Sequence, residues 1–155
     1  MIYKIFKIRN LTLSSLIFII SCTNTNDSEP IDCVNTITKN SITYVNEEKF
    51  TGQCYVYADN RQIVRLSSYK NGKPNGVYKG WYYQTGILAY EGRRKNGHIH
   101  GDYIGYREDG TLQAEGKFKK GFYNGVWKYY NNFEELILEK RFINGKAVDS
   151  TLITK

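Results

Sequence analysis

The sequence predicts an all-β protein, an elongated, twisted, single-layer antiparallel sheet of stacked β-hairpin repeats. Glycines recur with a period of about 24 residues, at positions 52, 76, 101 and 125 and again at 72, 97, 121 and 145. Each unit also holds two aromatic-rich or alternating runs separated by a turn signal such as Glu108-Asp109-Gly110, which is the pattern of a β-hairpin. Because so short a unit buries its apolar face only against its neighbours, the units must stack.

The glycine pattern also sets the expected boundaries. We expect a capping half-repeat at 33–51, full repeats at 52–75, 76–100, 101–124 and 125–149, and a C-terminal tail at 150–155. Ser41 to Val45 is expected to be the second strand of the cap. A single residue inserted before Gly86 breaks the register between repeats. The stretch Asn71 to Gly76 is expected to be a loop that returns the chain to the next hairpin.

Alternation along residues 111–119 assigns the two faces of a strand. Apolar or small residues on the dry face alternate with polar ones on the wet face, so the dry face is expected to carry Leu112, Ala114, Gly116 and Phe118. Arg94 and Lys140 are basic exceptions on the dry side. Aromatic residues repeat at two equivalent positions, Tyr78, Tyr103 and Trp127 at one and Trp81, Tyr106 and Tyr130 at the other. We expect these six to stack across repeats and to hold the sheet together.

The repeat reads Asn-Gly-Lys-x-x-Gly-x-Tyr/Trp-x-x-Tyr-Tyr-x-x-Gly-x-Leu-x-x-Glu-Gly and resembles the MORN-repeat family in its bacterial variant form. The resemblance covers about two-thirds of the chain. It implies a row of hairpins in one elongated sheet, in agreement with the period and the alternation. It also implies a binding or scaffolding module without catalytic residues; some relatives are lipid-associated and some bacterial ones are labelled antitoxin-like.

The N-terminus has the pattern of an export signal. Lys4, Lys7 and Arg9 precede an apolar stretch, Leu11 to Ile20, that is shorter than the roughly 20 residues needed to span a bilayer. The run ending in Ser21-Cys22 resembles a bacterial lipobox, which implies a lipoprotein signal peptide at 1–21 and a lipidated Cys22. The alternative is an ordinary signal with an incidental cysteine. Residues 22–32 are expected to form a flexible tether.

Two further features place the mature chain in the cell envelope. An aspartate directly after the lipidated cysteine would resemble an inner-membrane retention signal. This chain has Thr23 at that position, so we expect an outer-membrane lipoprotein that faces the periplasm or the surface. Removal of the signal lowers the 22 basic residues to 19 against 15 acidic ones, and the formal charge falls from +7 to +4. Nucleic acid is therefore not an expected partner of an exported chain with so mild a charge.

Cys33 and Cys54 are the cysteines left for the folded domain. In an oxidising compartment they are expected to form a disulfide, worth about 3 kcal/mol on the chain-entropy model. The alternative is two buried thiols, because a hairpin that turns near Glu47 places Cys54 opposite Ser41 and not opposite Cys33.

The sequence offers little for catalysis. It lacks the nucleophile-elbow, phosphate-loop and zinc-ribbon motifs, and we expect no catalytic residue, metal or cofactor. His98 and His100 are expected in the loop between the second and third repeats, without a third metal ligand beside them. Repetition places three glutamates, Glu91, Glu115 and Glu139, at equivalent positions. Each is followed two residues later, on the same wet face, by Arg93, Lys117 or Arg141, and we expect cross-strand ion pairing to account for the pattern.

Basic residues form a column on one face near one end of the strands, made up of Lys70, Arg93, Lys95, Lys117, Lys119 and Arg141. Anionic lipid headgroups beside the anchor are the candidate ligand. The alternative is a solvated face that charge keeps soluble, since glutamates interleave.

The sequence thus predicts a non-enzymatic, lipid-anchored envelope protein whose sheet is a protein- or membrane-interaction module. An antitoxin- or immunity-like protein with a specific protein partner is the alternative, and a hydrolase is the remote one. The oligomeric state is left open.

Overall fold

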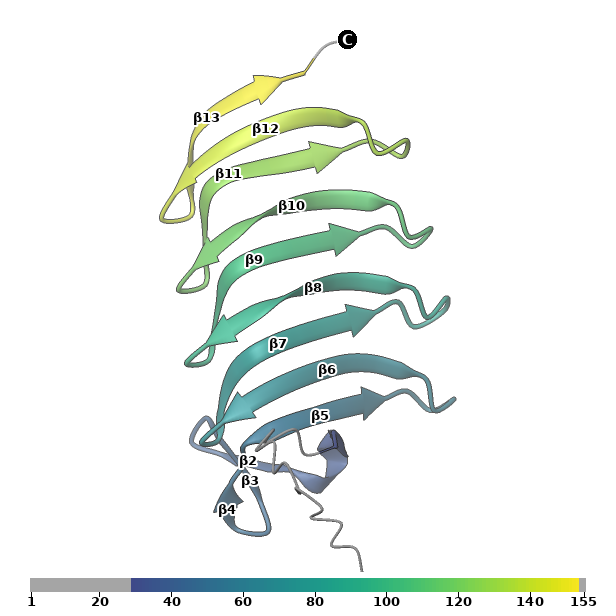
Figure 1. Ribbon diagram of the computed structural model, residues 1–155, viewed down its shortest axis with the longest axis vertical. Helices are drawn as coiled ribbons and strands as arrows, with labels where there is room; N and C mark the ends of the chain where they lie inside the picture. Colours follow the sequence, from purple (N-terminus) through teal and green to yellow (C-terminus); the bar gives the residue numbers. More distant parts are fainter. Residues whose placement is uncertain (1–28, 154–155) are drawn as a thin grey trace, which may run out of the picture.

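The computed structural model describes residues 29–153, which form two β-sheets (Figure 1). The large sheet has ten strands in the order β1-β5-β6-β7-β8-β9-β10-β11-β12-β13, and a second sheet has the order β2-β3-β4. Beyond β1, the strands of the large sheet are β5 (Gly52–Tyr57), β6 (Ile63–Lys70), β7 (Lys73–Trp81), β8 (Leu88–Lys95), β9 (His98–Tyr106), β10 (Leu112–Lys119), β11 (Phe122–Tyr130), β12 (Leu136–Ile143) and β13 (Lys146–Leu152). The architecture is an open antiparallel sheet of consecutive hairpins, as the sequence predicted.

The long turns lie inside the repeats. Residues 82–87 connect β7 to β8, whereas residues 107–111 connect β9 to β10, so the residue inserted before Gly86 lengthens one turn without disturbing the strands. One position of each long turn is left-handed, with φ values of 65° at Arg61, 70° at Gly86, 88° at Gly110 and 58° at Glu134. Two repeats therefore hold a non-glycine residue where the other two use glycine.

The repeats are joined by turns of only two residues. In Asn71-Gly72 both φ values are positive, 51° and 75°, and the same holds at 96–97, 120–121 and 144–145. This is the turn type whose twist matches that of paired strands, and asparagine followed by glycine is its preferred sequence. The expectation of a loop from 71 to 76 was therefore wrong, because β7 already begins at Lys73. His98 and His100 likewise lie in β9 and not in a loop.

A third set of glycines marks irregularities in the first strand of each hairpin. Gly76, Gly101 and Gly125 have φ values of 111°, 90° and 77°. Gly76 lies where the pairing register of β6 and β7 shifts, between the pairs Ser67–Tyr78 and Tyr69–Pro74. Such bulges bend a strand, and the first strands of the hairpins are visibly bent near the two-residue turns (Figure 1).

The N-terminal cap differs from the expected half-repeat. It consists of β1 (Ile31–Asp32), a 3₁₀ turn η1 (Cys33–Asn35), β2 (Ile37–Lys39), β3 (Ile42–Val45) and β4 (Glu48–Lys49). The last three strands form the separate small sheet, with β3 in its centre, while β1 pairs in parallel with β5. Tight turns with positive φ at Asn40-Ser41 and Asn46-Glu47 fold these strands on one another before the chain reaches β5.

The cap is attached to the first two-residue turn of the large sheet. The Thr43 amide donates to the Gly72 carbonyl at 2.8 Å, and the Gly72 amide donates to the Phe50 carbonyl at 2.7 Å. Gly72 is required here, since a Cβ atom would lie 2.5 Å from Ile42. At the other end, β13 continues to Leu152, so the sheet extends into residues that were expected to be a tail. No helix in the described range 29–153 is long and apolar enough to cross a membrane.

Candidate functional site

The dry face carries a continuous file of aromatic rings. Ring centroids are 5.5 Å apart for Tyr78 and Tyr90, 6.3 Å for Tyr90 and Tyr103, and 5.7 Å for Tyr103 and Trp127. The expected column of Tyr78, Tyr103 and Trp127 is therefore present, with Tyr90 linking its first two members. Trp127 is its best buried residue, 2% exposed, and its Nε1 donates to the Lys117 carbonyl at 3.0 Å.

Glycines provide the space for these rings. A Cβ atom at Gly116 would lie 2.4 Å from the Trp127 indole, and one at Gly92 would lie 2.8 Å from the Tyr78 ring. Large rings thus cover the bare backbone of the neighbouring strand, which hides apolar area on a face that no second layer covers among the residues that the structure describes.

The two basic exceptions on the dry face contact aromatic rings. The Arg94 guanidinium carbon lies 4.8 Å from the centroid of Tyr78, and the Lys140 ammonium lies 6.0 Å from that of Tyr129. Both are cation–π contacts, which keep a cation compatible with an aromatic surface. The Tyr78 hydroxyl and Arg94 Nε are buried and have no hydrogen-bond partner within residues 29–153. Burial, the largest cause, raises the pKa of Tyr78 to about 12.

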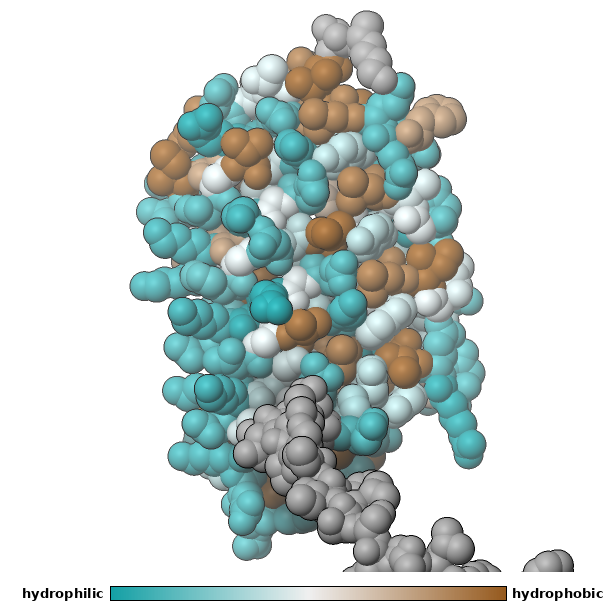
Figure 2. Space-filling model, viewed as in Figure 1, coloured by the Kyte–Doolittle hydropathy of each residue, from teal (hydrophilic) through white to brown (hydrophobic). Residues whose placement is uncertain are grey.

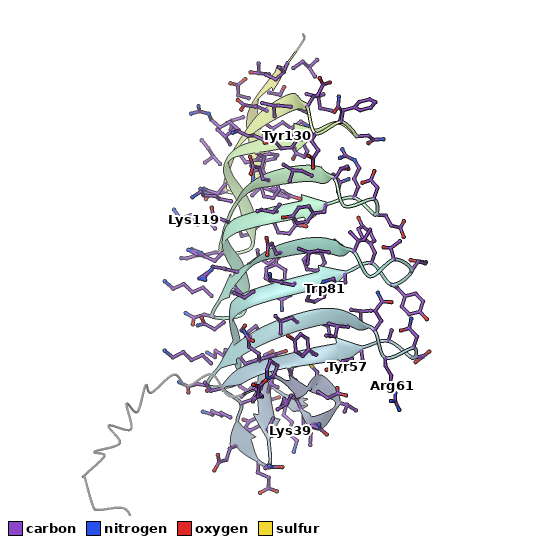
Figure 3. All side chains as sticks on the ribbon, turned by 45° about the vertical axis from the view of Figure 1, so that its right-hand side comes forward. Lys39, Tyr57, Arg61, Trp81, Lys119 and Tyr130 are labelled. Carbon is purple, nitrogen blue, oxygen red and sulfur yellow. A yellow bond between two sulfur atoms is a disulfide. The ribbon has the colours of Figure 1, made fainter. Side chains whose placement is uncertain are left out.

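The second aromatic column, Trp81, Tyr106 and Tyr130, lies on the opposite, wet face (Figure 3). The Tyr106 hydroxyl donates to Glu91 at 3.5 Å, and the Tyr130 hydroxyl donates to Glu115 at 2.7 Å. Burial first, and then this bond to Glu115, raises the pKa of Tyr130 to about 12. A bulge between Leu112 and Ala114 pairs Leu112 with Tyr106. Leu112 therefore lies on the wet face, and its expected place beside Gly116 was wrong.

Two of the three glutamates form cross-strand ion pairs, which is the kind of pairing that the sequence predicted. Glu91 bonds to Lys79 at 2.8 Å and Glu115 to Lys128 at 3.9 Å. Lys117, which follows Glu115 on the same face, bonds across strands to Asp102 at 3.0 Å. Geometry favours these cross-strand pairs, because residues two apart on a strand are separated by about 6.6 Å, whereas directly opposed Cβ atoms are about 5 Å apart.

The expected basic column is exposed along one end of the sheet. Its members Lys70, Arg93, Lys95, Lys117, Lys119 and Arg141 are all exposed. They alternate in register with the glutamate row and therefore share its face, but they lie nearer to the two-residue turns. Figure 3 shows Lys119 at this end. The structure adds three exposed lysines at the same turns: Lys120 within one turn, and Lys73 and Lys146 directly after two others. Sequence reasoning missed them because it placed these positions in loops or outside the alternating strands.

Open hollows lie between these rows on the wet face. One of about 350 Å³ is lined by charged residues including Asp102, Lys117 and Lys128 and by the apolar Ile104 and Val126. A second of about 260 Å³ is lined by the equivalent surface one repeat earlier, including Val77, Glu91 and Arg93. The two hollows lie at equivalent positions because the sequence repeats. Charged residues that line them form ion pairs with one another across strands.

A file of hydrogen bonds that the sequence did not reveal links the long turns. Gln62 Nε2 donates to the Tyr82 carbonyl at 3.2 Å, and the Tyr82 hydroxyl donates to the Tyr106 carbonyl at 2.8 Å. Arg107 donates to the Asn131 carbonyl at 3.1 Å and also to the Tyr130 carbonyl. Each side chain reaches the next repeat. The only sequence signal is that Tyr82, Arg107 and Asn131 share the first position of a long turn.

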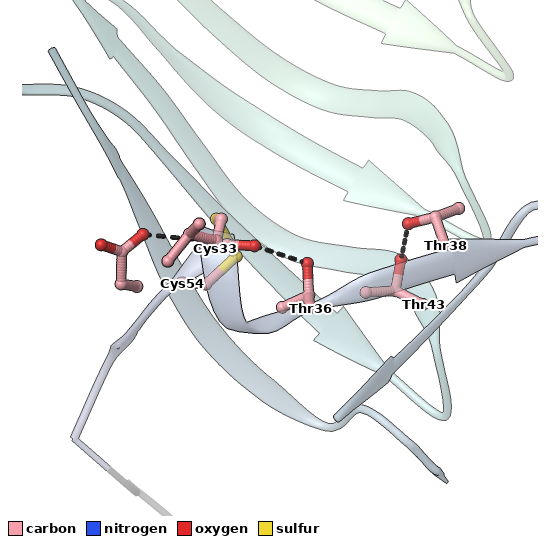
Figure 4. The surroundings of a disulfide bond; sticks show 7 residues. Cys33, Thr36, Thr38, Thr43 and Cys54 are labelled. Carbon is pink, nitrogen blue, oxygen red and sulfur yellow. Dashed lines mark hydrogen bonds between the residues drawn. A yellow bond between two sulfur atoms is a disulfide. The ribbon is translucent and has the colours of Figure 1, made fainter. Parts of the chain in front are cut away.

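The structure joins Cys33 and Cys54 by a disulfide with a Cα–Cα distance of 5.0 Å (Figure 4). Ile31 pairs with Cys54, so β1 lies beside β5 and places Cys33 within reach. Ser41, which was expected opposite Cys54, is instead part of the tight turn before β3. The Asp32 carboxylate accepts from the Val34 amide at 2.9 Å and so caps the 3₁₀ turn that carries Cys33.

No group of three or more His, Cys, Asp or Glu residues within 29–153 is arranged to hold a metal ion. His100 Nδ1 accepts from the Lys120 amide at 3.4 Å, which ties it to the neighbouring repeat. Cys22 and the expected signal peptide lie outside the described residues.

Comparison with protein-family models finds no match to this chain, and comparison with curated proteins finds none either.

Proposed function

We propose that the protein is a non-enzymatic, lipid-anchored envelope protein that lays the basic end of its sheet on an anionic surface of the membrane that anchors it. The motif of its repeats supports placing it with the MORN-repeat proteins. The anchor is Cys22, and an outer membrane is the proposed location.

One observation carries the choice of ligand. Glutamates that interleave in the sequence are engaged elsewhere in the structure, Glu91 by Lys79 and Tyr106, and Glu115 by Lys128 and Tyr130. Lysines that flank the two-residue turns, such as Lys70, Lys95 and Lys119, remain exposed. They recur every two strands, about 9.6 Å apart, which forms a row of positive charge beside the two-residue turns. Each such residue near an anionic membrane contributes about 1 kcal/mol.

The test compares the vesicle binding of two triple variants. Both are made in a Cys22→Ser chain, because this substitution removes the lipid anchor from the measurement. Lys70, Lys95 and Lys119 are replaced by glutamine in one variant. Arg61, in a long turn, and Arg65 and Lys140, on the dry face, are replaced by glutamine in the other. Vesicles containing phosphatidylglycerol are compared with pure phosphatidylcholine. Loss of three contacts should weaken binding to the anionic vesicles about 100-fold in the first variant, and the second should bind like the parent.

Equal losses in the two triple variants would show that net charge alone, and not this row, mediates binding. Absence of binding to anionic vesicles would favour the alternative of a specific protein partner, as in an antitoxin- or immunity-like role. The anchor is tested separately, because Cys22→Ser should remove the lipid mass from the mature chain and release the protein from membrane fractions.

A further inference from the structure

Charge is divided unequally between the two faces of the large sheet. The acidic residues of strands β5 to β13 all lie on the wet face, and they are Glu91, Asp102, Glu115, Glu139 and Asp149. Hydrophilic residues also line most of the edge formed by the two-residue turns in the space-filling view (Figure 2). The dry face of the same strands carries Arg65, Arg94 and Lys140 and no acidic residue. Its formal charge within these strands is therefore entirely positive.

These dry-face cations have no carboxylate partner within residues 29–153. Arg94 and Lys140 are partly buried against the rings of Tyr78 and Tyr129, and Arg65 is exposed. A partly buried charge is screened less by water than a fully solvated one, so it attracts an anion more strongly. The dry face is therefore complementary in charge to an anionic ligand.

The tyrosine hydroxyls of the two faces are also engaged differently. On the wet face the hydroxyls of Tyr106 and Tyr130 donate to glutamates. On the dry face the hydroxyls of Tyr90, Tyr123 and Tyr129 make no hydrogen bond within residues 29–153, and all three side chains are at least partly exposed. Because a phenol hydroxyl both donates and accepts, the dry face offers several hydrogen-bonding groups to a ligand.

The dry-face cations are too far apart to meet one small anion. Arg65 lies on β6, Arg94 on β8 and Lys140 on β12, so the first and the last are separated by six strand spacings, about 29 Å. The aromatic file crosses the strands in the same direction, with successive ring centroids 5.5, 6.3 and 5.7 Å apart from Tyr78 to Trp127. A ligand that contacts all of these groups must be an extended chain with acidic groups along it.

We propose that the dry face binds a linear acidic polysaccharide that lies across the strands along the aromatic file. Sugar rings have apolar C–H faces that pack on partly exposed aromatic rings. Their hydroxyls pair with the free phenol hydroxyls, and their acidic groups pair with the unpartnered cations. One ligand thus accounts for the rings, the hydroxyls and the charge of this face.

An acidic peptide is the other extended polyanion, and the sheet face suits it less well. Peptides bind sheets by pairing their backbone with an open edge strand. On the face, the strand backbones bond to one another in the plane of the sheet, so a peptide there would find no backbone partners for its own amides and carbonyls. A polysaccharide has no such backbone groups and matches single hydroxyls instead.

The test uses two acidic polymers, polygalacturonate and alginate, with the fully methyl-esterified form of polygalacturonate as the uncharged comparison. Calorimetry measures their binding to the Cys22→Ser chain. Glutamine in place of Arg65, Arg94 and Lys140 should weaken binding to the acidic polymers about 30-fold, since each is a partly exposed ion contact. The ester, which has no charge to pair, should bind the parent and this variant equally. The triple glutamine variant of the lysine row described above loses the same charge from elsewhere and should bind both acidic polymers like the parent.

A second variant tests the hydroxyls without a change of charge. Tyr90→Phe, Tyr129→Phe keeps both rings and should weaken binding to polygalacturonate about 10-fold, because two neutral hydrogen bonds are lost. Both dry-face variants should keep the thermal midpoint of the parent, which separates lost contacts from unfolding. Polyglutamate, which has the charge but no sugar rings, should bind more weakly than polygalacturonate.

Equal losses in the dry-face and lysine-row triple variants would overturn the proposal, because net charge alone would then mediate binding. A parent that binds neither acidic polysaccharide would also overturn it. Polyglutamate that binds as tightly as polygalacturonate would replace the polysaccharide with an acidic protein as the ligand of this face.

Discussion

The Trp127 indole covers the backbone of Gly116 so closely that a Cβ atom at position 116 would lie 2.4 Å from the ring. Two residues on neighbouring strands of different repeats thus share one volume. The contact explains why the third repeat has glycine in the middle of a strand, where glycine otherwise costs stability. It also couples the third repeat to the fourth.

Trp127→Ala should lower the free energy of unfolding by about 3 kcal/mol or more, as large-to-small changes of buried aromatic residues do. His98→Ala, an exposed change, should cost under about 0.5 kcal/mol. Equilibrium urea unfolding of the two variants measures both. A silent Trp127→Ala would mean that the aromatic file does not hold the sheet together.

Gly116→Ala should cost about 2 kcal/mol because its methyl group overlaps the indole. In a Trp127→Ala background the same methyl group enters the space that the ring has left, so its cost should fall to well under 1 kcal/mol. The coupling energy in this double-mutant cycle should therefore exceed about 1 kcal/mol. Additive effects of the two substitutions would contradict the shared volume.

Much of this arrangement could be predicted from the sequence, because the repeat shows each position several times. The glycine period and the alternation predicted the hairpins, and equivalent positions predicted the aromatic column of Tyr78, Tyr103 and Trp127. The repeat period does not specify bulges or the register between neighbouring strands, and the features that depend on them were not predicted. The bulge that moves Leu112 to the other face is one example. The pairing of Glu115 with Lys128 is another, since it depends on the cross-strand register.

The tyrosines should make stability fall at high pH. The pKa of Tyr130 is raised to about 12 in the folded chain, whereas an unfolded tyrosine titrates near 10. The contribution of Tyr130 is therefore complete below about pH 10 and is lost as the pH rises through 12. Tyr130→Phe also loses the bond to Glu115 and should cost about 1 kcal/mol at pH 8. Its urea midpoint should fall less steeply than that of the parent between pH 10 and 12; parallel curves would reject the assignment.

Tyr78→Phe is the matched comparison, because the Tyr78 hydroxyl is buried without a partner among residues 29–153. Removal of an unpaired buried hydroxyl should leave the unfolding free energy at pH 8 unchanged or raise it slightly. A loss of more than about 1 kcal/mol would show that this hydroxyl makes a bond in the folded protein.

Reduction of the disulfide should mainly weaken the N-terminal end of the sheet. Cys33 and Cys54 are 21 residues apart, and closing a loop of this size is worth about 3 kcal/mol on the chain-entropy model. The double variant Cys33→Ser, Cys54→Ser should lose about this amount and should show faster amide exchange in β5 than in β11. Two freely alkylated thiols in exported protein would show that the bond does not form in the cell.

Arg107 should hold the third and fourth repeats together at the long-turn end. Its guanidinium donates to the Leu112 carbonyl at 2.8 Å within its own repeat, and to the carbonyls of Asn131, at 3.1 Å, and of Tyr130 in the next. Arg107→Met keeps much of the aliphatic stem but leaves these acceptors unpaired. The expected cost is about 2 kcal/mol, because hydrogen bonds from a charged donor are stronger than neutral ones.

The control for Arg107 is Arg93→Met, which removes the same charge from an exposed position and should cost under about 0.5 kcal/mol. Amide exchange locates the effect. In Arg107→Met the turn at residues 131–135 should exchange faster while the turn at 82–87 stays protected, since Tyr82 bridges to Tyr106 without Arg107. If both arginine variants cost the same, the long-turn bonds do not link the repeats, and the aromatic file alone accounts for their cohesion.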